Sequence, residues 1–171
     1  MEFDLKKHSV DLGIKLGTFL FFVTAVIYVI DLKLFANPFI MLAFMLPTLA
    51  VSIYSVLSAR KIQNQIITFK EAFIAYFLCV AIGYLIVTIG IIVIFKFIDP
   101  VAADLVHEEL MVFTKHGLEI MQANQKDIDI LMESMQNNHS YSYMAIFQNY
   151  VNALLRNAIF GLFVALIFKK S

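Results

Sequence analysis

The stretch FKEAFIAYFLCVAIGYLIVTIGIIVIFKF, residues 69–97, decides the class of fold to which this chain belongs. Its charged residues, Lys70, Glu71 and Lys96, lie at its two ends, and every residue between them is uncharged. A helix rises about 1.5 Å per residue and the hydrocarbon core of a bilayer is about 30 Å thick, so about 20 such residues cross a membrane. The sequence therefore predicts a transmembrane helix here, long enough to tilt or to project from the bilayer.

Three further apolar stretches have the same character, at residues 12–30, 38–57 and 146–168. The whole chain has 171 residues, of which 61% are hydrophobic and only 15% are charged, whereas about a quarter are charged in soluble domains. The mean hydropathy is +0.82. We therefore expect an all-α integral membrane protein with four transmembrane helices, forming a single membrane domain over residues 1–171.

Residues 99–143, between the third and fourth spans, form the only sizeable polar segment. Asp99 and Pro100 are a typical N-cap and first residue of a helix. One straight helix over residues 100–135 would be about 54 Å long, so we expect a break near Gly117 or Asn124, which folds the segment into a hairpin or lays it on the bilayer. Helical character is indicated by residues that recur at spacings near three, four or seven: Leu110, Phe113, Gly117, Met121, Ile128, Leu131 and Met135.

Basic residues near the spans gather on one side of the predicted topology. With four spans, the N-terminus, the loop between spans two and three, and the C-terminus share that side. These segments hold Lys6, Lys7, Arg60, Lys61, Lys70, Lys169 and Lys170, whereas the loop between spans one and two holds only Lys33. Because cytoplasmic loops are rich in lysine and arginine, we expect both termini to be cytoplasmic and the amphipathic helical segment 99–143 to be periplasmic.

Three short motifs have structural explanations. The stretch GIKLG, Gly13–Gly17, has the glycine spacing that lets two helices approach closely, and we expect it to serve packing within this chain. Thr68 and Glu71 have the spacing of a capping box at the start of the third span. Pro47 removes one backbone hydrogen bond from the second span and should kink it.

The sequence contains no pattern typical of a soluble active site. Thirteen basic and thirteen acidic residues cancel, so charge gives no reason to expect a nucleic-acid partner. HEELM, residues 107–111, lacks the second histidine of a zinc motif, and His116 with Glu119 is one pair where a metal needs three or four ligands. Cys79 is the single cysteine and lies in an apolar run. We expect no catalytic residue, no metal and no cofactor.

Arg156 is the charged residue inside the fourth span. Asn149, Asn152 and Arg156 share one helix face, at spacings of three and four, and we expect this face to point into the bundle. Three interpretations stay open for the guanidinium. It snorkels or pairs with Asp31 or Asp99, it pairs with a carboxylate of a partner protein, or it binds an anionic ligand such as a lipid phosphate.

Four motifs stand in a recognisable order: IYSVLSARK at the end of span two, ITFKEAF at the start of span three, FIDP at its outer end, and ALIFKK at the last span. In this order the chain resembles an uncharacterised Bacteroidota family of small four-span inner-membrane proteins, a domain-of-unknown-function family. That family is glycine-rich just before span three, where this chain has Gln63–Gln65. The resemblance implies a bacterial inner membrane and no assigned chemistry.

These observations favour a non-catalytic inner-membrane subunit that anchors or scaffolds a partner protein in a membrane complex. The alternative is a small transporter, or a protein that binds an anionic lipid or a lipid phosphate through the polar face of span four. In both cases Arg156, Asn152 and Asn149 are the predicted binding residues. The expected partners are membrane lipids and either a second membrane protein or another copy of the chain. An enzyme at the outer interface has no acid–base pair with a supporting spacing.

Overall fold

The structure, a computed structural model, describes residues 2–169 but not the side chains at positions 2, 3, 38 and 41. Within this range the chain forms helices and their connections. In chain order they are α1 (Glu2–Ile30), the 3₁₀-helix η1 (Leu32–Ala36), α2 (Pro38–Ile62), α3 (Phe69–Ile92), the π-helix η2 (Val93–Ile98), α4 (Pro100–Ile120), α5 (Gln125–Asn137) and α6 (Tyr143–Phe168).

Four of these helices are long and apolar enough to cross a membrane, which confirms the predicted all-α membrane fold. The membrane-competent segments are Asp4–Ile30, Leu42–Ile62, Phe69–Ile98 and Tyr143–Phe168. The predicted spans have the right order, but α1 and α6 begin earlier than their apolar stretches do. Extending a helix by one residue is far easier than starting it, so the polar flanks of an apolar stretch stay helical.

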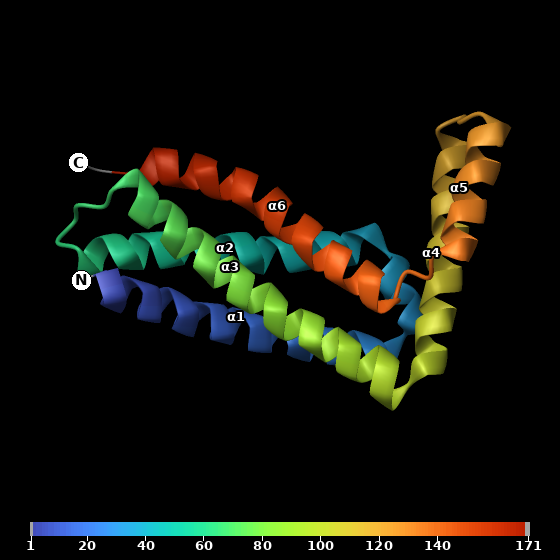
Figure 1. Cartoon of the computed structure of the whole chain (residues 1–171), viewed down its shortest axis with the longest axis horizontal. Coiled ribbons are helices and arrows are strands. Elements are labelled where there is room, and N and C mark those ends of the chain that lie inside the picture. The colour runs from blue at the N-terminus through green and yellow to red at the C-terminus, as the bar shows by residue number, and fades with distance from the viewer. Residues whose placement is uncertain (1, 170–171) are drawn as a thin grey trace.

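α3 lies at the centre of the bundle, and α1, α2 and α6 all pack on it (Figure 1). The most extensive contact is with α1, through the predicted glycine motif. A Cβ atom on Gly17 would lie 2.7 Å from the carbonyl oxygen of Gly83, and one on Gly13 would lie 2.7 Å from that of Cys79. Only glycine permits this approach, so the expectation that GIKLG serves packing within the chain is confirmed.

Hydroxyl groups line the buried side of α2. Thr48 and Ser52 are fully buried and donate to the carbonyl oxygens four residues earlier, at 2.8 Å and 2.7 Å. Ser55 donates across the bundle to the carbonyl oxygen of Ala75 in α3, at 2.9 Å. Thr48, Ser52 and Ser55 therefore satisfy their hydrogen bonds internally, as a membrane interior requires. α2 itself continues through Pro47 without interruption.

The start of α1, the α2–α3 turn and the end of α6 lie at the same end of the bundle (Figure 1). Lys170, one of the basic residues used to predict orientation, lies outside the described residues. The predicted capping box is confirmed, because Thr68 Oγ1 accepts the Glu71 N–H at 3.3 Å and the Glu71 carboxylate accepts the Thr68 N–H at 2.9 Å. In the turn, Asn64 and Gln65 have positive φ angles of 56° and 71°.

Aromatic side chains close the opposite end of the bundle. Phe95, in η2, is fully buried, and its ring centroid lies 6.4, 5.5 and 4.5 Å from those of Tyr28, Phe35 and Tyr141. Asp99 then caps α4, as predicted, by accepting the backbone N–H three residues later at 3.0 Å. This cap fixes the corner at which the chain leaves the bundle.

α4 and α5 form a helical hairpin that lies across this end of the bundle (Figure 1). α4 continues through Gly117 and ends at Ile120, and Asn124 caps α5, so the break occurs at the second of the two predicted places. Gln122 has a positive φ of 54° in the turn between them. Such a left-handed residue commonly ends a helix, because it turns the next N–H groups back to the last carbonyls.

Candidate functional site

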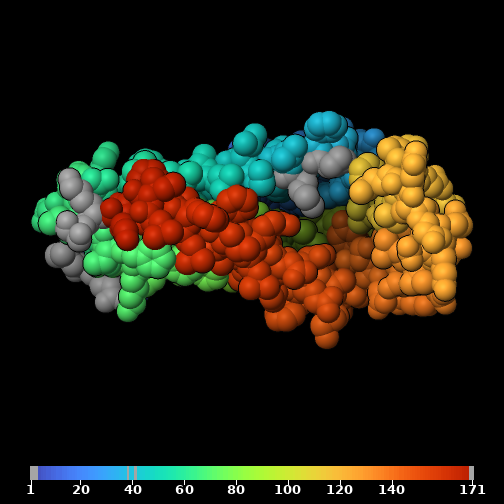
Figure 2. Space-filling view, turned by 90° about the horizontal axis from the view of Figure 1, so that it is seen from above, coloured from blue at the N-terminus to red at the C-terminus, as the bar shows by residue number. Residues whose placement is uncertain are grey.

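The predicted polar stripe of α6, formed by Asn149, Asn152 and Arg156, lies on the outside of the bundle. All three residues are exposed, and α6 forms an uncovered ridge along one face of the molecule (Figure 2). The expectation that this stripe points into the bundle is therefore wrong. Asn157, the neighbour of Arg156, is buried instead.

Small side chains explain how α6 is oriented. Ala153, Asn157 and Gly161 are buried, and a Cβ atom on Gly161 would lie 2.7 Å from the ring of Tyr76 in α3. Asn157 can sit in this contact because its side-chain amide donates to the carbonyl oxygen of Ala153 at 2.8 Å. Close packing in membranes favours the face with the smallest side chains, so the polar stripe is left on the flank of α6.

Arg156 has no hydrogen bond or ion pair with any residue in the described range 2–169. Asp31, one acid considered as its partner, caps η1 by accepting the Lys33 N–H at 2.9 Å. Asp99, the other, accepts the hydroxyl of Tyr28 at 3.0 Å and caps α4. The pairing of Arg156 with either acid is therefore not formed.

Arg156 lies close to the middle of α6, where the membrane environment makes a lone cation unfavourable. An arginine at the centre of a membrane helix costs about 3 kcal/mol on insertion scales. Its planar guanidinium presents five N–H donors, which suit a carboxylate or a phosphate. Asn149 and Asn152 add amide donors and acceptors on the same face. The stripe can therefore bind an anionic group that approaches from the side, within the membrane.

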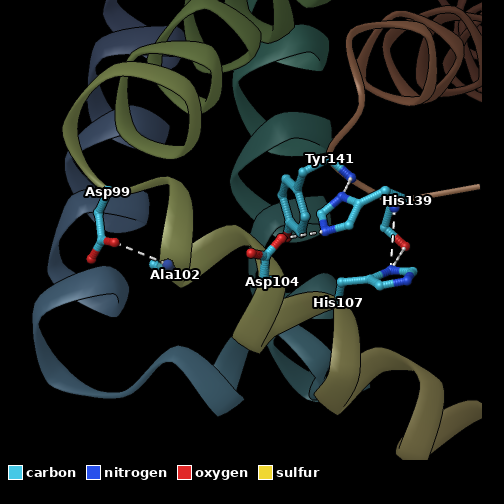
Figure 3. A network of polar contacts seen from close by, with 7 residues as sticks. Asp99, Ala102, Asp104, His107, His139 and Tyr141 are labelled. Atoms are coloured by element: carbon cyan, nitrogen blue, oxygen red, sulfur yellow. Dashed lines mark hydrogen bonds and ion pairs between the residues drawn. The ribbon is translucent and has the colours of Figure 1, made fainter. Parts of the chain in front are cut away.

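A second polar cluster joins α4 to the loop between α5 and α6 (Figure 3). The backbone N–H of Ser140 donates to Nδ1 of His107 at 3.2 Å, and its hydroxyl oxygen lies 2.8 Å from the same nitrogen. The backbone N–H of Tyr141 donates to Nδ1 of His139 at 3.1 Å. The two imidazole rings lie against each other, with centroids 4.3 Å apart. We call these residues, together with Asp104, the histidine junction.

The geometry of the histidine junction favours one tautomer of each neutral ring. A ring nitrogen that accepts a backbone N–H carries no proton, so the neutral rings carry theirs on Nε2. Nε2 of His139 lies 3.0 Å from the Asp104 carboxylate, but off the direction of a hydrogen bond, so the contact is electrostatic. Burial, and then the neighbouring His139, lower the pKa of His107, whereas the backbone of Met135, followed by Asp104 and Glu108, acts in the opposite direction. The junction therefore holds the loop to α4 with a neutral His107.

Sequence reasoning considered His107 only as a metal ligand and missed His139. Among the described residues, no group of three or more histidine, cysteine, aspartate or glutamate side chains is placed to hold a metal ion. The available signal was position, because His107 follows the start of the hairpin and His139 lies where the chain returns to the last span. No spacing in the sequence states that these two turns meet.

The four membrane-competent helices define the chain as a multi-pass membrane protein. Over residues 12–170 it matches the family described as "Protein of unknown function (DUF4199)", and it belongs to that family. The predicted resemblance to a domain-of-unknown-function family is thereby confirmed, whereas the Bacteroidota source stays a prediction. No curated protein and no solved structure matches the chain.

Proposed function

We propose that this chain is a non-catalytic subunit of a bacterial inner-membrane complex, which anchors or scaffolds a partner protein through the outward face of α6. The observation that carries the proposal is Arg156, exposed near the middle of a membrane helix and unpaired among the described residues. A carboxylate on a neighbouring transmembrane helix would neutralise the guanidinium. The amides of Asn149 and Asn152 would then hydrogen-bond to the same helix.

The proposed orientation places both termini in the cytoplasm and the α4–α5 hairpin in the periplasm. Its support is the distribution of basic residues. Arg60, Lys61 and Lys70 flank the α2–α3 turn, which lies at the same end of the bundle as the start of α1 and the end of α6 (Figure 1). The acidic residues of the hairpin do not oppose this orientation, because lysine and arginine set topology and acids contribute little.

Native mass spectrometry of the protein, extracted gently from its own membrane, tests the proposed anchor. We expect a second polypeptide in fixed stoichiometry with this chain. Arg156→Ala should release that polypeptide, because it leaves the partner's carboxylate buried without a counter-charge, which typically costs about 3–5 kcal/mol.

Leu155→Ala is the matched control, because Leu155 is the neighbouring residue of α6 and is 62% exposed but uncharged. It should keep the partner. A complex that survives Arg156→Ala as well as it survives Leu155→Ala would show that the polar stripe is not the anchor. Arg156→Lys should weaken the complex less than Arg156→Ala, since it keeps the charge but loses the planar fork of donors.

The alternative is that the stripe binds an anionic lipid or a lipid phosphate, either alone or as part of a small transporter. The observation that favours it is the position of Arg156, Asn152 and Asn149 on an exposed flank of α6, where lipid headgroups of a thinned or tilted region can reach. The same experiment would then give a lone chain or a homo-oligomer that carries an anionic lipid. Arg156→Ala should remove that lipid, and Leu155→Ala should not.

A further inference from the structure

α4 is amphipathic over its whole length. Ala102 and Val106 are buried against the end of the bundle, and Phe113 and Ile120 follow Val106 on the same face at spacings of seven. Phe113 is nevertheless 46% exposed and Ile120 is 69% exposed. The opposite face of α4 carries exposed charged residues, which are Asp104, Glu108, Lys115 and Glu119.

The outer half of the hairpin projects past the bundle. Figure 1 shows the first turns of α4 across the end of the spans and the tip of the hairpin beyond their edge. In Figure 2 the hairpin stands at one end of the molecule, beside the start of α2. α5 packs on α4 and on no other helix of the described residues. Phe113 and Ile120 therefore face the same way as Val106, toward the plane of the membrane, and the described helices leave both side chains partly uncovered.

The lipid-facing surface of α2 continues onto this part of α4. Phe39, Val112 and Phe113 line one groove between the start of α2 and the middle of α4. Phe39 is strongly exposed, as are Leu42 and Leu46, which follow it on the same face of α2 at spacings of three and four. The apolar surface that the bilayer covers on α2 is therefore continuous with the uncovered apolar face of α4.

Charge at this corner is compatible with contact to lipid. The polar residues that line the groove are Lys33, Asn37, Glu109 and His116. The carboxylate of Glu109 lies 2.9 Å from the ammonium of Lys33 in η1, so these two charges compensate each other. The other acids of α4 lie on the opposite face. An amphipathic helix of this kind lies in the membrane interface, with its apolar side buried and its charged side in water.

We propose that the outer half of the α4–α5 hairpin lies on the bilayer surface, with Phe113 and Ile120 inserted among the lipids. The occupant of this face is the membrane itself, at the boundary between headgroups and acyl chains, about 5–10 Å deep. Since the exposed charges of α4 are mainly acidic, apolar burial drives the contact and anionic lipid is not required. The proposal is independent of the anchor on α6, because it concerns a different helix.

The experiment uses tryptophan fluorescence, because the chain contains no tryptophan. Full-length protein carrying Phe113→Trp is reconstituted in phosphatidylcholine vesicles, in which part of the lipid is brominated near the top of the acyl chains. We expect blue-shifted emission, strong quenching by the brominated lipid and little quenching by acrylamide in the water. Ile120→Trp, on the same face, should behave alike.

Lys115→Trp is the matched control, two residues away on the charged face and exposed. It should show red-shifted emission, quenched by acrylamide and not by brominated lipid. The preference of tryptophan for interfaces is the same in both variants, so it does not explain a difference. The proposal is overturned if Phe113→Trp is as open to acrylamide as Lys115→Trp. It is equally overturned if Phe113→Trp is shielded from both quenchers, since a protein partner or a second copy would then cover this face.

Discussion

Gln65, in the α2–α3 turn, has a backbone conformation that glycine adopts more easily. Its φ is 71°, which lies in the left-handed region. A side chain in this left-handed region costs about 1 kcal/mol, which glycine relieves while losing more chain entropy on folding. Gln65→Gly should therefore raise the free energy of unfolding by about 0.5 kcal/mol. Thermal unfolding in detergent measures the change.

Gln63→Gly supplies the control for this turn. Gln63 has a φ of −96°, and its side-chain amide donates to the Glu71 carboxylate at 2.9 Å. Glycine relieves no strain here and removes a hydrogen bond, so stability should fall. If both glycine variants shift the unfolding temperature in the same direction, the backbone conformation of Gln65 is not the cause.

Gly17 and Gly117 allow the same substitution in two opposite environments. A Cβ atom on Gly17 meets the Gly83 carbonyl at 2.7 Å, whereas one on Gly117 meets nothing within 4 Å. Gly17→Ala should lower the free energy of unfolding by about 1–3 kcal/mol, the usual effect of overpacking. Gly117→Ala should raise it by up to about 1 kcal/mol through helix propensity. If thermal unfolding shows the same change in stability for both variants, the close α1–α3 crossing is not the reason why Gly17 is required.

At the scale of helices, the sequence predicts which helices span the membrane better than it predicts which face of each helix packs against a neighbour. The length of an apolar run decides whether a helix can span the membrane, so the four spans could be found from composition alone. The capping box of Thr68 and Glu71 is a local contact and was also found. The outward orientation of Arg156 was not, because helical spacing tells which residues share a face and not which face packs.

The face of α6 that packs against the bundle is marked in the sequence by small residues. Ala153, Asn157 and Gly161 recur every four residues, and they are buried against α3. The spacing of Asn149, Asn152 and Arg156 predicted instead that the polar face would point into the bundle, because polar groups avoid lipid. Close backbone approach to α3 decided the orientation instead. The histidine junction could not be predicted for a similar reason, since His107 and His139 meet only through the tertiary fold.

The junction between α4 and the α5–α6 loop should loosen in acid. Burial holds the pKa of His107 below its ordinary value of about 6.5. With the loop released, the ring binds a proton more readily. The stability of the closed loop is therefore complete above about pH 6.5, and it falls as the pH drops from there toward the lowered pKa. Protonation also takes the Nδ1 acceptor away from the Ser140 N–H.

Hydrogen exchange of the Ser140 amide measures this effect, expressed as a protection factor so that the intrinsic rate is removed. Protection should be constant above about pH 6.5 and should fall as the pH drops below that value, toward the lowered pKa of His107. His107→Gln should flatten most of this dependence. His139 and Asp104 face the same cluster, so His139→Gln serves as the companion variant. Full pH dependence in His107→Gln would assign the effect to a group other than His107.

At the scale of the whole molecule, the fold separates two candidate interaction surfaces. α3 forms the core and gives its sides to α1, α2 and α6, so each outer helix has one face free for lipid or for a partner. α6 lies along one side of the bundle and the hairpin lies at one end of it (Figures 1 and 2). The exposed polar residues of α6 and the exposed apolar residues of α4 therefore belong to separate parts of the surface. Because the two surfaces belong to different helices, a lateral partner and a lipid-bound hairpin can coexist without competing for the same residues.

The orientation of this whole arrangement can be measured with single cysteines. Cys79, the only native cysteine, is fully buried between α1 and α3, so its thiol should not react. A cysteine placed by Gln136→Cys on the exposed surface of α5 should react with a membrane-impermeant maleimide in intact spheroplasts, given a periplasmic hairpin. A cysteine placed by Ile66→Cys in the exposed α2–α3 turn should react only after the membrane is permeabilised. Neither change alters a lysine or arginine, so the charges that set topology stay in place. The reverse pattern of labelling would show that the orientation is the opposite of the proposed one, with the hairpin in the cytoplasm.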